Sequence, residues 1–330
     1  PGNVRRYGAQ GNGSSDDTAA LQAGFNAAQA ANFSFPVYLP TGDYVINSPL
    51  RIRGEAPKSL VLVGEGGAFG IRNTTITAGN RGSGDAMIQS DGKRKNGWTI
   101  ADIWFDGGTR AKCLLDLREL NYLTLRGCRF ASAIGTVDRH GLAAVTLNNG
   151  WVTRFENCVF AGCWDALYCG VSTNNLNLWG CSFAGNKGIG FRGRGCQSVN
   201  IAGSVFEDNE QTGILLDICR SVWINGKYFE MNGEKGYAYQ KGDKRTIRAD
   251  IIANGWVSPE IRSKDPCKGI GVFGNFFFPP KDGALDSSIY LIAVDGFTEG
   301  ENEVHRPYPQ PAAFVKTKNQ PGVYMARELS

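Results

Sequence analysis

The sequence lacks several features that mark whole classes of protein. No apolar run approaches the roughly 18 residues of a membrane-spanning helix, and no signal-peptide pattern opens the chain. There are only two histidines, no Cys-X-X-Cys pair and no calcium-loop motif. The net charge of +4 is far from the clustered basic signature of nucleic-acid-binding proteins. We therefore expect no membrane insertion, no nucleic acid, no metal and no other cofactor.

The cysteines do not form a recognisable framework. Nine is an odd number, and a chain of 330 residues does not need a disulfide scaffold. Free cysteine is usually buried, so we expect packed thiols and folding in a reducing cytosol. The chain begins at Pro1 rather than methionine, and we expect that a leader or an upstream domain has been removed.

What the sequence does contain is a repeat. The phrases GCRF at 127–130, NCVF at 157–160, GCSF at 180–183 and GSVF at 203–206 are variants of one pattern. The final residue of the phrase recurs at intervals of 23 to 30 residues, at Phe105, Phe130, Phe160, Phe183, Phe206, Phe229, Ile252 and Phe277. Such a period identifies a solenoid, in which no repeat buries its apolar residues alone.

Other positions keep the same period. The residue five before each phenylalanine is apolar, and the residue three before it is usually Gly, Asn or Asp, which tolerate a left-handed backbone bend. Each repeat therefore contains three short strands separated by turns. Stacking the repeats in register pairs each strand in parallel with its equivalent one turn later. The sequence thus predicts an all-β fold, a parallel β-helix.

The first fifty residues follow a different pattern. Leu21, Phe25 and Ala28 share one face of a predicted helix, with Ser15 or Asp16 as its N-cap. This helix is expected to cover the open apolar end of the coil. We expect an N-terminal segment at 1–50, the β-helix at 51–300 and an extended proline-rich tail at 301–330.

The N-terminal segment also carries a family resemblance. VRRYGAQGNGSSDDTAALQAGF and VYLPTGDYVINSPL, between residues 4 and 50, resemble the start of the pectate-lyase-like superfamily of right-handed β-helix proteins. Its members include polygalacturonases, pectate and alginate lyases, and phage tailspike depolymerases. The resemblance implies a right-handed coil and a polysaccharide partner, and a tailspike would imply a homotrimer. The motif identifies the fold rather than the reaction, and helix capping explains Asp16 and Asp17.

One outer face of the predicted coil carries polar and charged residues. On the first strand of each repeat, alternation places five charged side chains outward: Asp116, Arg118, Arg192, Arg194 and Asp217. This pattern has two interpretations. It is either a solvated strand face with ion pairs between rungs, or a face that binds an anionic or hydroxyl-rich sugar chain through arginine.

The repeat is interrupted once, by an insertion at 131–144 that holds Asp138, Arg139 and His140. Insertions in solenoids form surface loops, often on the binding face. The RHG sequence there is faintly similar to the Gly-His-Gly element of polygalacturonases. The flanking aspartate motifs of that family are absent, so its catalytic residues are not transferred. The equivalent turn one rung later carries Asp165 and Trp164, which is interpreted either as a sugar-stacking or as a core residue.

Glycoside hydrolysis requires two carboxyl groups, and two pairs are available. Asp165 and Asp217 lie two rungs apart, about 9–10 Å along the axis and at the upper edge of the inverting range. Glu207 and Glu230 lie one rung apart, about 5 Å, which matches a retaining pair but also a chance surface arrangement. Stacked Asn186, Asn209 and Asn232 are expected to form a structural amide ladder.

These patterns lead to a functional hypothesis. The chain is expected to be a glycan depolymerase, extracellular or virion-associated, that hydrolyses a bacterial surface polysaccharide. Asp165 and Asp217 are the expected acid and base, and Glu207 is a further catalytic candidate. The expected sugar contacts are Arg118, His140, Trp164, Lys187, Arg192 and Arg194.

Two alternatives remain open. One is a polysaccharide lyase, in which Lys187, Arg192 and Arg194 would supply a base and neutralise a uronate carboxylate. The other is a non-catalytic adhesin or spike protein that binds glycan through the same face.

Overall fold

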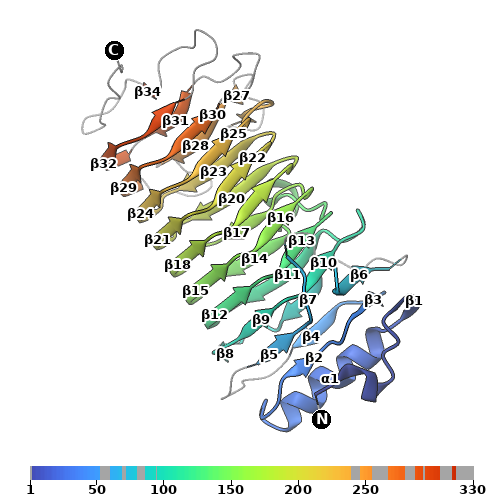
Figure 1. Cartoon of the computed structure of the whole chain (residues 1–330). Coiled ribbons are helices and arrows are strands. Elements are labelled where there is room, and N and C mark those ends of the chain that lie inside the picture. Colours follow the sequence, from blue (N-terminus) through green and yellow to red (C-terminus); the bar gives the residue numbers. More distant parts are fainter. Residues whose placement is uncertain are drawn as a thin grey trace. The chain divides into compact units, whose positions relative to one another are not determined.

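The computed structural model describes residues 2–52, 60–68, 72–79, 86–93, 95–238, 246–254, 267–278, 287–292, 294–304 and 314–316. The chain divides into two compact units, Pro1–Tyr168 and Cys169–Ser330. In each unit the strands stack in parallel into three sheets, here called A, B and C (Figure 1). The predicted all-β, right-handed parallel β-helix is confirmed.

In the first unit every turn of the coil contributes a strand to each sheet. Sheet A contains β2 (Val37–Tyr38), β5 (Val61–Val63), β9 (Thr99–Ala101), β12 (Leu120–Arg126) and β15 (Trp151–Glu156), with β8 (Lys95–Asn96) paired to β12. Sheet B contains β1 (Asn12–Asp16), β3 (Gly42–Ile46), β6 (Thr74–Ala78), β10 (Trp104–Asp106), β13 (Arg129–Ala131) and β16 (Val159–Ala161). Sheet C contains β4 (Leu50–Ile52), β7 (Ala86–Ser90), β11 (Cys113–Arg118), β14 (Val145–Asn148) and β17 (Leu167–Cys169).

The second unit repeats this organisation. Sheet A contains β18 (Asn174–Trp179), β21 (Gln197–Ala202), β24 (Arg220–Asn225), β29 (Cys267–Phe273) and β32 (Val294–Gly300). Sheet B contains β19 (Ser182–Ala184), β22 (Val205–Glu207), β25 (Tyr228–Glu230), β30 (Phe276–Phe278) and β33 (Glu303–Val304). Sheet C contains β20 (Ile189–Arg194), β23 (Thr212–Asp217), β28 (Ala249–Asn254), β31 (Ser287–Ile292) and β34 (Phe314–Lys316).

Some strands lie in segments that the sequence assigned to the two ends. β1 and β3 belong to sheet B although they lie within 1–50. β33 and β34 lie within the expected tail, where residues 305–313 and 317–330 lie outside the described residues.

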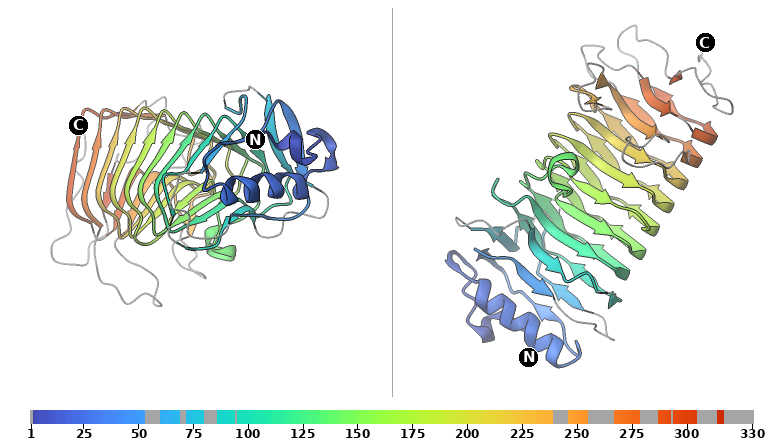
Figure 2. Two further views of the ribbon diagram at one scale, coloured as in Figure 1. Left: turned by 90° about the horizontal axis from the view of Figure 1, so that it is seen from below. Right: turned by 180° about the vertical axis from the view of Figure 1, so that it is seen from behind.

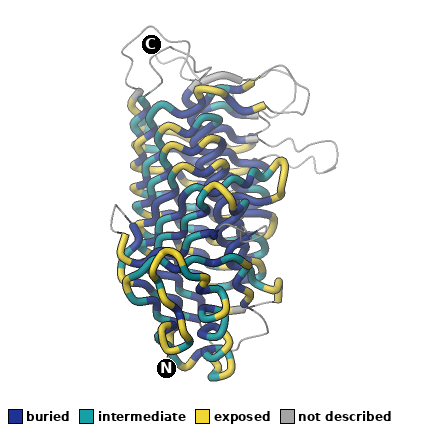
Figure 3. Tube along the Cα trace, turned by 90° about the vertical axis from the view of Figure 1, so that its right-hand side faces the viewer, coloured by how far each residue is buried: buried dark blue, intermediate teal, exposed yellow. Residues whose placement is uncertain are grey.

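The repeated phenylalanines fill the interior, as predicted. The assignment of Ile252 to their column is wrong, because Ile252 lies on β28 of sheet C opposite Leu215 and Phe229 pairs directly with Phe277. Phe183 and Phe206 stack with ring centroids 4.7 Å apart, and Phe206 and Phe229 follow at 5.3 Å. In the first unit, Phe105 and Phe130 stack at 5.4 Å. Each of these rings is buried, and buried residues, in dark blue, recur at each turn of the trace in Figure 3. The in-register repeat therefore makes one aromatic column in each unit.

One end of the first unit is covered by α1 (Thr18–Ala30), which follows the short 3-10 helix η1 (Val4–Tyr7) (Figures 1 and 2). Leu21, Phe25 and Ala28 are buried as predicted, and α1 packs against β2 and β4. The predicted N-cap is wrong, because Asp17 occupies that position and makes no side-chain cap bond. Its carboxylate instead accepts hydrogen bonds from the backbone of Gln10 and Gly11, at 2.6 and 3.0 Å.

Polar and sulfur-containing side chains form further columns inside the coil. The nine cysteines are all free and buried, as expected. Asn186 Nδ2 donates to Asn209 Oδ1 at 2.8 Å, and Asn209 Nδ2 donates to Asn232 Oδ1 at 2.7 Å, which confirms the amide ladder. The ladder continues to Asp250, which accepts from Asn232 at 3.0 Å. Burial raises the pKa of the Asp250 carboxyl to about 8.

Two segments leave the regular coil. Between β13 and β14, the insertion forms the short helix α2 (Val137–His140), which stands outside the strands of the first unit (Figure 2). Between β25 and β28, β26 (Tyr237–Ala238) pairs antiparallel with β27 (Thr246–Ile247) to form a hairpin. These two segments decide which strand faces remain accessible.

Candidate functional site

The expected sugar-binding face lies on sheet C, and most of it is not accessible. The strand register is as predicted, with Arg192 opposite Leu215 and Arg194 opposite Asp217. Yet Asp116, Arg192 and Asp217 are only 7, 7 and 5% exposed. The prediction that these three side chains line an open face is therefore wrong.

The cover in the second unit is the β26–β27 hairpin. Tyr237 and Ile247 of the hairpin pack with residues of sheet C into one hydrophobic cluster, which also contains Ile189, Leu215, Ala249 and Ile252. The Arg192 guanidinium lies 5.8 Å from the centroid of the Tyr237 ring. Alternation along a strand sets the direction of a side chain, but a packed hairpin can still exclude water from it.

Beneath this cover, Arg192 and Asp217 form an ion pair between adjacent rungs. Arg192 Nε donates to Asp217 Oδ2 at 3.0 Å, with both side chains almost fully buried. Of the interpretation as a solvated face with ion pairs between rungs, the ion pair is confirmed for these residues, but the solvation is not, because both side chains are buried. Arg194, one rung from Asp217 in the register, is half-buried.

Asp165 and Asp217, the expected acid and base, belong to different units, and each carboxylate has a role within its own unit. Asp165 is buried, and its Oδ2 accepts a hydrogen bond from the backbone N–H of Val137 at 2.7 Å. This hydrogen bond therefore links the start of α2 to the turn that carries Asp165.

The other candidates of the first unit are exposed. Arg118 binds Asp116 through two hydrogen bonds, from Nε at 3.0 Å and from Nη2 at 2.9 Å, and this bonding raises the pKa of Arg118. His140 Nδ1 accepts from the Thr136 backbone at 3.2 Å. Trp164 is exposed, as its sugar-stacking interpretation requires.

Glu207 and Glu230 present a different environment. They are register partners on β22 and β25, and both are half-buried on the outer face of sheet B. Partial burial raises the pKa of Glu207, and the neighbouring carboxylates of Glu230 and Asp208 raise it further. Lys187, of the same unit, is exposed.

An aromatic pair that the sequence analysis missed lies beside these glutamates. Tyr228, on β25, stacks on Phe276 of β30 with centroids 5.5 Å apart and ring planes 2° apart. Partial burial raises the pKa of the Tyr228 hydroxyl, and the neighbouring Glu230 carboxylate raises it further. A signal was available, because Tyr228 immediately precedes an inward phenylalanine and must therefore point outward. Carboxylates beside an accessible stacked ring suit a polyhydroxylated ligand.

The outer face of sheet A was also missed. Trp179 and Trp223 of the second unit are 39 and 51% exposed, the latter at an outward position of β24. Both tryptophans lie on the second strand of a repeat, whereas the predicted binding face was limited to outward residues of the first strand.

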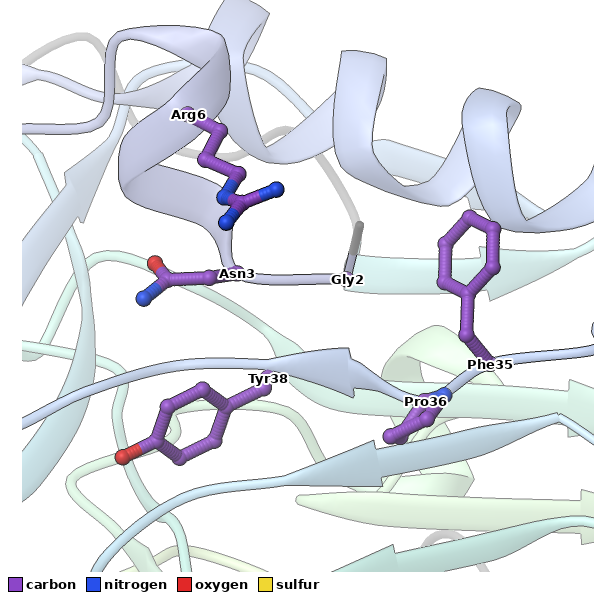
Figure 4. Close-up of a pocket in the computed structure, with 6 residues that line it drawn as sticks. All are labelled: Gly2, Asn3, Arg6, Phe35, Pro36 and Tyr38. Atoms are coloured by element: carbon purple, nitrogen blue, oxygen red, sulfur yellow. The ribbon is translucent and has the colours of Figure 1, made fainter.

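A cavity of about 350 Å³ lies beside the N-terminal segment of the first unit (Figure 4). It is lined by Gly2, Asn3, Arg6, Phe35, Pro36 and Tyr38, none of which the sequence analysis proposed. Within the described ranges, no three His, Cys, Asp or Glu side chains are grouped to hold a metal ion. No helix in the described part of the chain has the length and apolar character to cross a bilayer.

Comparison with solved structures finds similar folds at low sequence identity. The ORF18 protein of Geobacillus virus E2 is 16% identical, with a TM-score of 0.61 over 92% of this chain and 61% of its own. PfbA, a surface adhesin of Streptococcus pneumoniae, is 16% identical, with a TM-score of 0.61 over 92% of this chain and 84% of its own. The tailspike protein of Acinetobacter baumannii phage AM24 is 12% identical, with a TM-score of 0.60 over 92% and 54%. At these identities the likeness establishes the fold.

Sequence comparison adds a more specific relation. Mannuronan C5-epimerase AlgE3 of Azotobacter vinelandii is 39% identical over 97 residues, which are 29% of this chain and only 4% of the epimerase. The model of the family described as rhamnogalacturonase A/epimerase, pectate lyase-like, matches residues 2–237, well over half of the chain. The chain therefore belongs to the rhamnogalacturonase A/epimerase, pectate lyase-like family.

Proposed function

We propose that this protein is a polysaccharide-degrading enzyme that hydrolyses glycosidic bonds, with Glu207 as the general acid and Glu230 as the nucleophile. The observation that carries the proposal is the pairing of the two glutamates on adjacent rungs of sheet B, with the pKa of Glu207 raised. This assignment moves the catalytic pair away from Asp165 and Asp217, whose carboxylates bind Val137 and Arg192.

The geometry fits the retaining mechanism. Adjacent parallel strands are about 4.8 Å apart, close to the separation of about 5–5.5 Å that is typical of retaining enzymes. Glu207, which keeps its proton to higher pH than an ordinary carboxyl, protonates the leaving oxygen. Glu230 attacks the anomeric carbon and forms a covalent glycosyl intermediate. Water, deprotonated by Glu207, then releases the sugar with retained configuration.

Tyr228 has two functions in this proposal. Its ring, stacked on Phe276, supports a sugar residue, and its hydroxyl, whose pKa the Glu230 carboxylate raises, offers a hydrogen bond to that sugar. We propose a bacterial surface polysaccharide as substrate and an extracellular or virion-associated location. The tailspike and adhesin neighbours and the epimerase relative support this class of partner. A homotrimer, and sugar contacts at Arg118, His140, Trp164, Lys187 and Arg194, remain predictions.

The test uses the whole chain and purified bacterial capsular, exopolysaccharide and alginate preparations. We expect new reducing ends from the wild-type protein, and a fall in turnover of about 10²–10⁴-fold in Glu207→Gln, the range for a general acid. Glu230→Gln should abolish turnover. Glu156→Gln is the matched control, because Glu156 is also half-buried on an outer face, in the first unit, and it should keep full activity.

Other products would assign other reactions. Unsaturated ends that absorb ultraviolet light would establish the lyase alternative. Of its three candidate residues, Arg192 is bound to Asp217, which leaves Arg194 and Lys187 to neutralise a uronate. A changed uronate composition without chain shortening would establish epimerisation. Turnover that survives in both glutamine variants would overturn the proposed pair. Binding without any product would establish the adhesin alternative, which the exposed tryptophans of sheet A favour.

A further inference from the structure

On the outer face of sheet A in the second unit, two columns of residues, each running across the strands from rung to rung, contain no charged side chain. In each column the residues are register partners on β18, β21, β24, β29 and β32. The first column is Asn177, Asn200, Trp223, Gly271 and Thr298, and the second is Trp179, Ala202, Asn225, Phe273 and Gly300. Charged residues make up 20% of the whole chain, so ten uncharged outward positions on one face distinguish this surface.

Trp223 lies flat at the centre of this surface. The residue is 51% exposed, and its ring stacks on Phe273 with centroids 5.6 Å apart and planes 21° apart. Gly271, its register partner, is buried under the ring, and a Cβ built there would lie 2.9 Å from the indole. The absence of a side chain at Gly271 therefore allows the indole to lie against the sheet, with its other face open.

Amide groups flank the exposed ring. The side chains of Asn200 and Asn225, at the neighbouring positions of the two columns, have no protein hydrogen-bond partner among the residues that the structure describes. Asn177 Nδ2 donates to Asn175 Oδ1 at 2.9 Å, which holds the Asn177 side chain in place. Each amide supplies donors and acceptors to a ligand without adding charge.

This composition favours a sugar chain over a protein partner. A protein-docking patch is centred on a contiguous apolar core, with its polar groups at the rim. Here the Trp223 and Phe273 rings lie on adjacent strands, with the Asn200 amide as the register partner of Trp223 and the Asn225 amide as that of Phe273. The strand spacing of about 4.8 Å is close to the length of one hexopyranose. The apolar C–H face of a pyranose covers an indole, and its hydroxyl groups pair with amides at the ring edge.

We propose that Trp223, Phe273, Asn200 and Asn225 form a binding surface for an uncharged glycan whose chain runs across the strands of sheet A. The surface is separate from the Glu207–Glu230 pair, which lies on sheet B, and the proposal does not depend on catalysis there. Trp223 supplies the stacking surface, and the two amides select hydroxyl-bearing ligands over carboxylate-bearing ones.

The test measures binding to cellohexaose, mannohexaose, maltohexaose and hexamannuronate by isothermal titration calorimetry and tryptophan fluorescence. At least one neutral hexaose should bind the wild-type chain more tightly than hexamannuronate does. Trp223→Ala should weaken that binding at least tenfold, whereas Trp223→Phe, which keeps a flat ring, should weaken it less. Gly271→Ala should also weaken binding, because the new methyl displaces the indole while every ligand-facing side chain remains.

Two controls separate this proposal from the others. Trp151→Ala removes an indole that is also exposed on sheet A, but in the first unit, and should bind like wild type. The variant Glu207→Gln/Glu230→Gln should also bind normally, so that a failure of the catalytic proposal leaves this one intact. The proposal is overturned if none of the neutral hexaoses binds, if hexamannuronate binds best, or if a folded Trp223→Ala variant, checked by circular dichroism, binds as tightly as wild type.

Discussion

The second unit contains two carboxylate pairings between adjacent rungs that differ sharply in their surroundings. Asp217 on sheet C is buried and bound to Arg192, whose guanidinium lies against the Tyr237 ring, whereas Glu207 on sheet B faces a second carboxylate and remains half-buried. Both pairings arise from the same strand spacing and the same alternation of side chains. The difference comes from the hairpin, which covers the relevant part of sheet C.

This contrast separates structural from chemical roles. A buried carboxylate bound to arginine has its charge neutralised and its hydrogen bonds satisfied, so it is poorly placed to bind a sugar. A half-buried carboxylate beside another one has a raised pKa and an open side, which are the properties of a catalytic acid. In a solenoid, the segment that lies over a strand face therefore matters as much as the residues on that face.

The largest expected effect on stability comes from removing one partner of the buried pair. Asp217→Asn leaves the Arg192 guanidinium buried without its counter-ion and should lower the free energy of unfolding by about 3–5 kcal/mol. The double variant Arg192→Met/Asp217→Leu should recover most of this loss. Guanidinium chloride denaturation measures both. The control is Asp116→Asn, because its partner Arg118 is exposed and can rehydrate. If Asp116→Asn lowers the free energy of unfolding as much as Asp217→Asn does, burial does not explain the effect.

An intermediate effect is expected from removing the cover itself. Tyr237→Ala opens the hairpin side of the Arg192–Asp217 pair to water. The coupling energy of the pair, measured by a double-mutant cycle in this background, should fall to about 1 kcal/mol or less, the range of exposed pairs. Tyr237→Phe keeps the ring and should leave the coupling unchanged. An equal coupling energy in the alanine background would show that the hairpin does not control the dielectric environment of the pair.

The smallest effect is expected at Glu207. Because the folded state raises its pKa above the ordinary value of 4.5, the folded protein holds this proton more tightly than the unfolded chain does. The free energy of unfolding therefore falls as the pH rises above about 4.5 and through the pKa that Glu207 has in the folded protein. At pH 7 the free energy of unfolding of Glu207→Gln should exceed that of wild type by roughly 0.2–1 kcal/mol. Below pH 4, where Glu207 is protonated, this contribution of the Glu207 charge should be absent. Thermal unfolding across pH 3–8 measures it, and an advantage that grows toward low pH would contradict the sign.

The sequence predicted features that repeat and missed features that occur once. The phenylalanine column, the amide ladder from Asn186 to Asn232 and the buried thiols each follow from one residue type recurring at one position. The role of Asp165 was not predictable in this way, because its hydrogen bond to Val137 depends on how one insertion folds back. The burial of Arg192 depends likewise on a single hairpin.

Alone, the sequence determined the coil, the register of most rungs and the direction of most strand side chains. These properties are local: a strand alternates its side chains with a period of two, and a period near 23 residues stacks equivalent positions. The sequence misplaced Ile252, because the β26–β27 hairpin lies in the turn between Phe229 and Phe277. Only the tertiary structure decided which outward faces meet water, because cover comes from segments such as the β26–β27 hairpin that pack against strands distant in sequence. The GCRF-type phrase therefore specifies the scaffold, while the insertions decide where on it chemistry and binding are available.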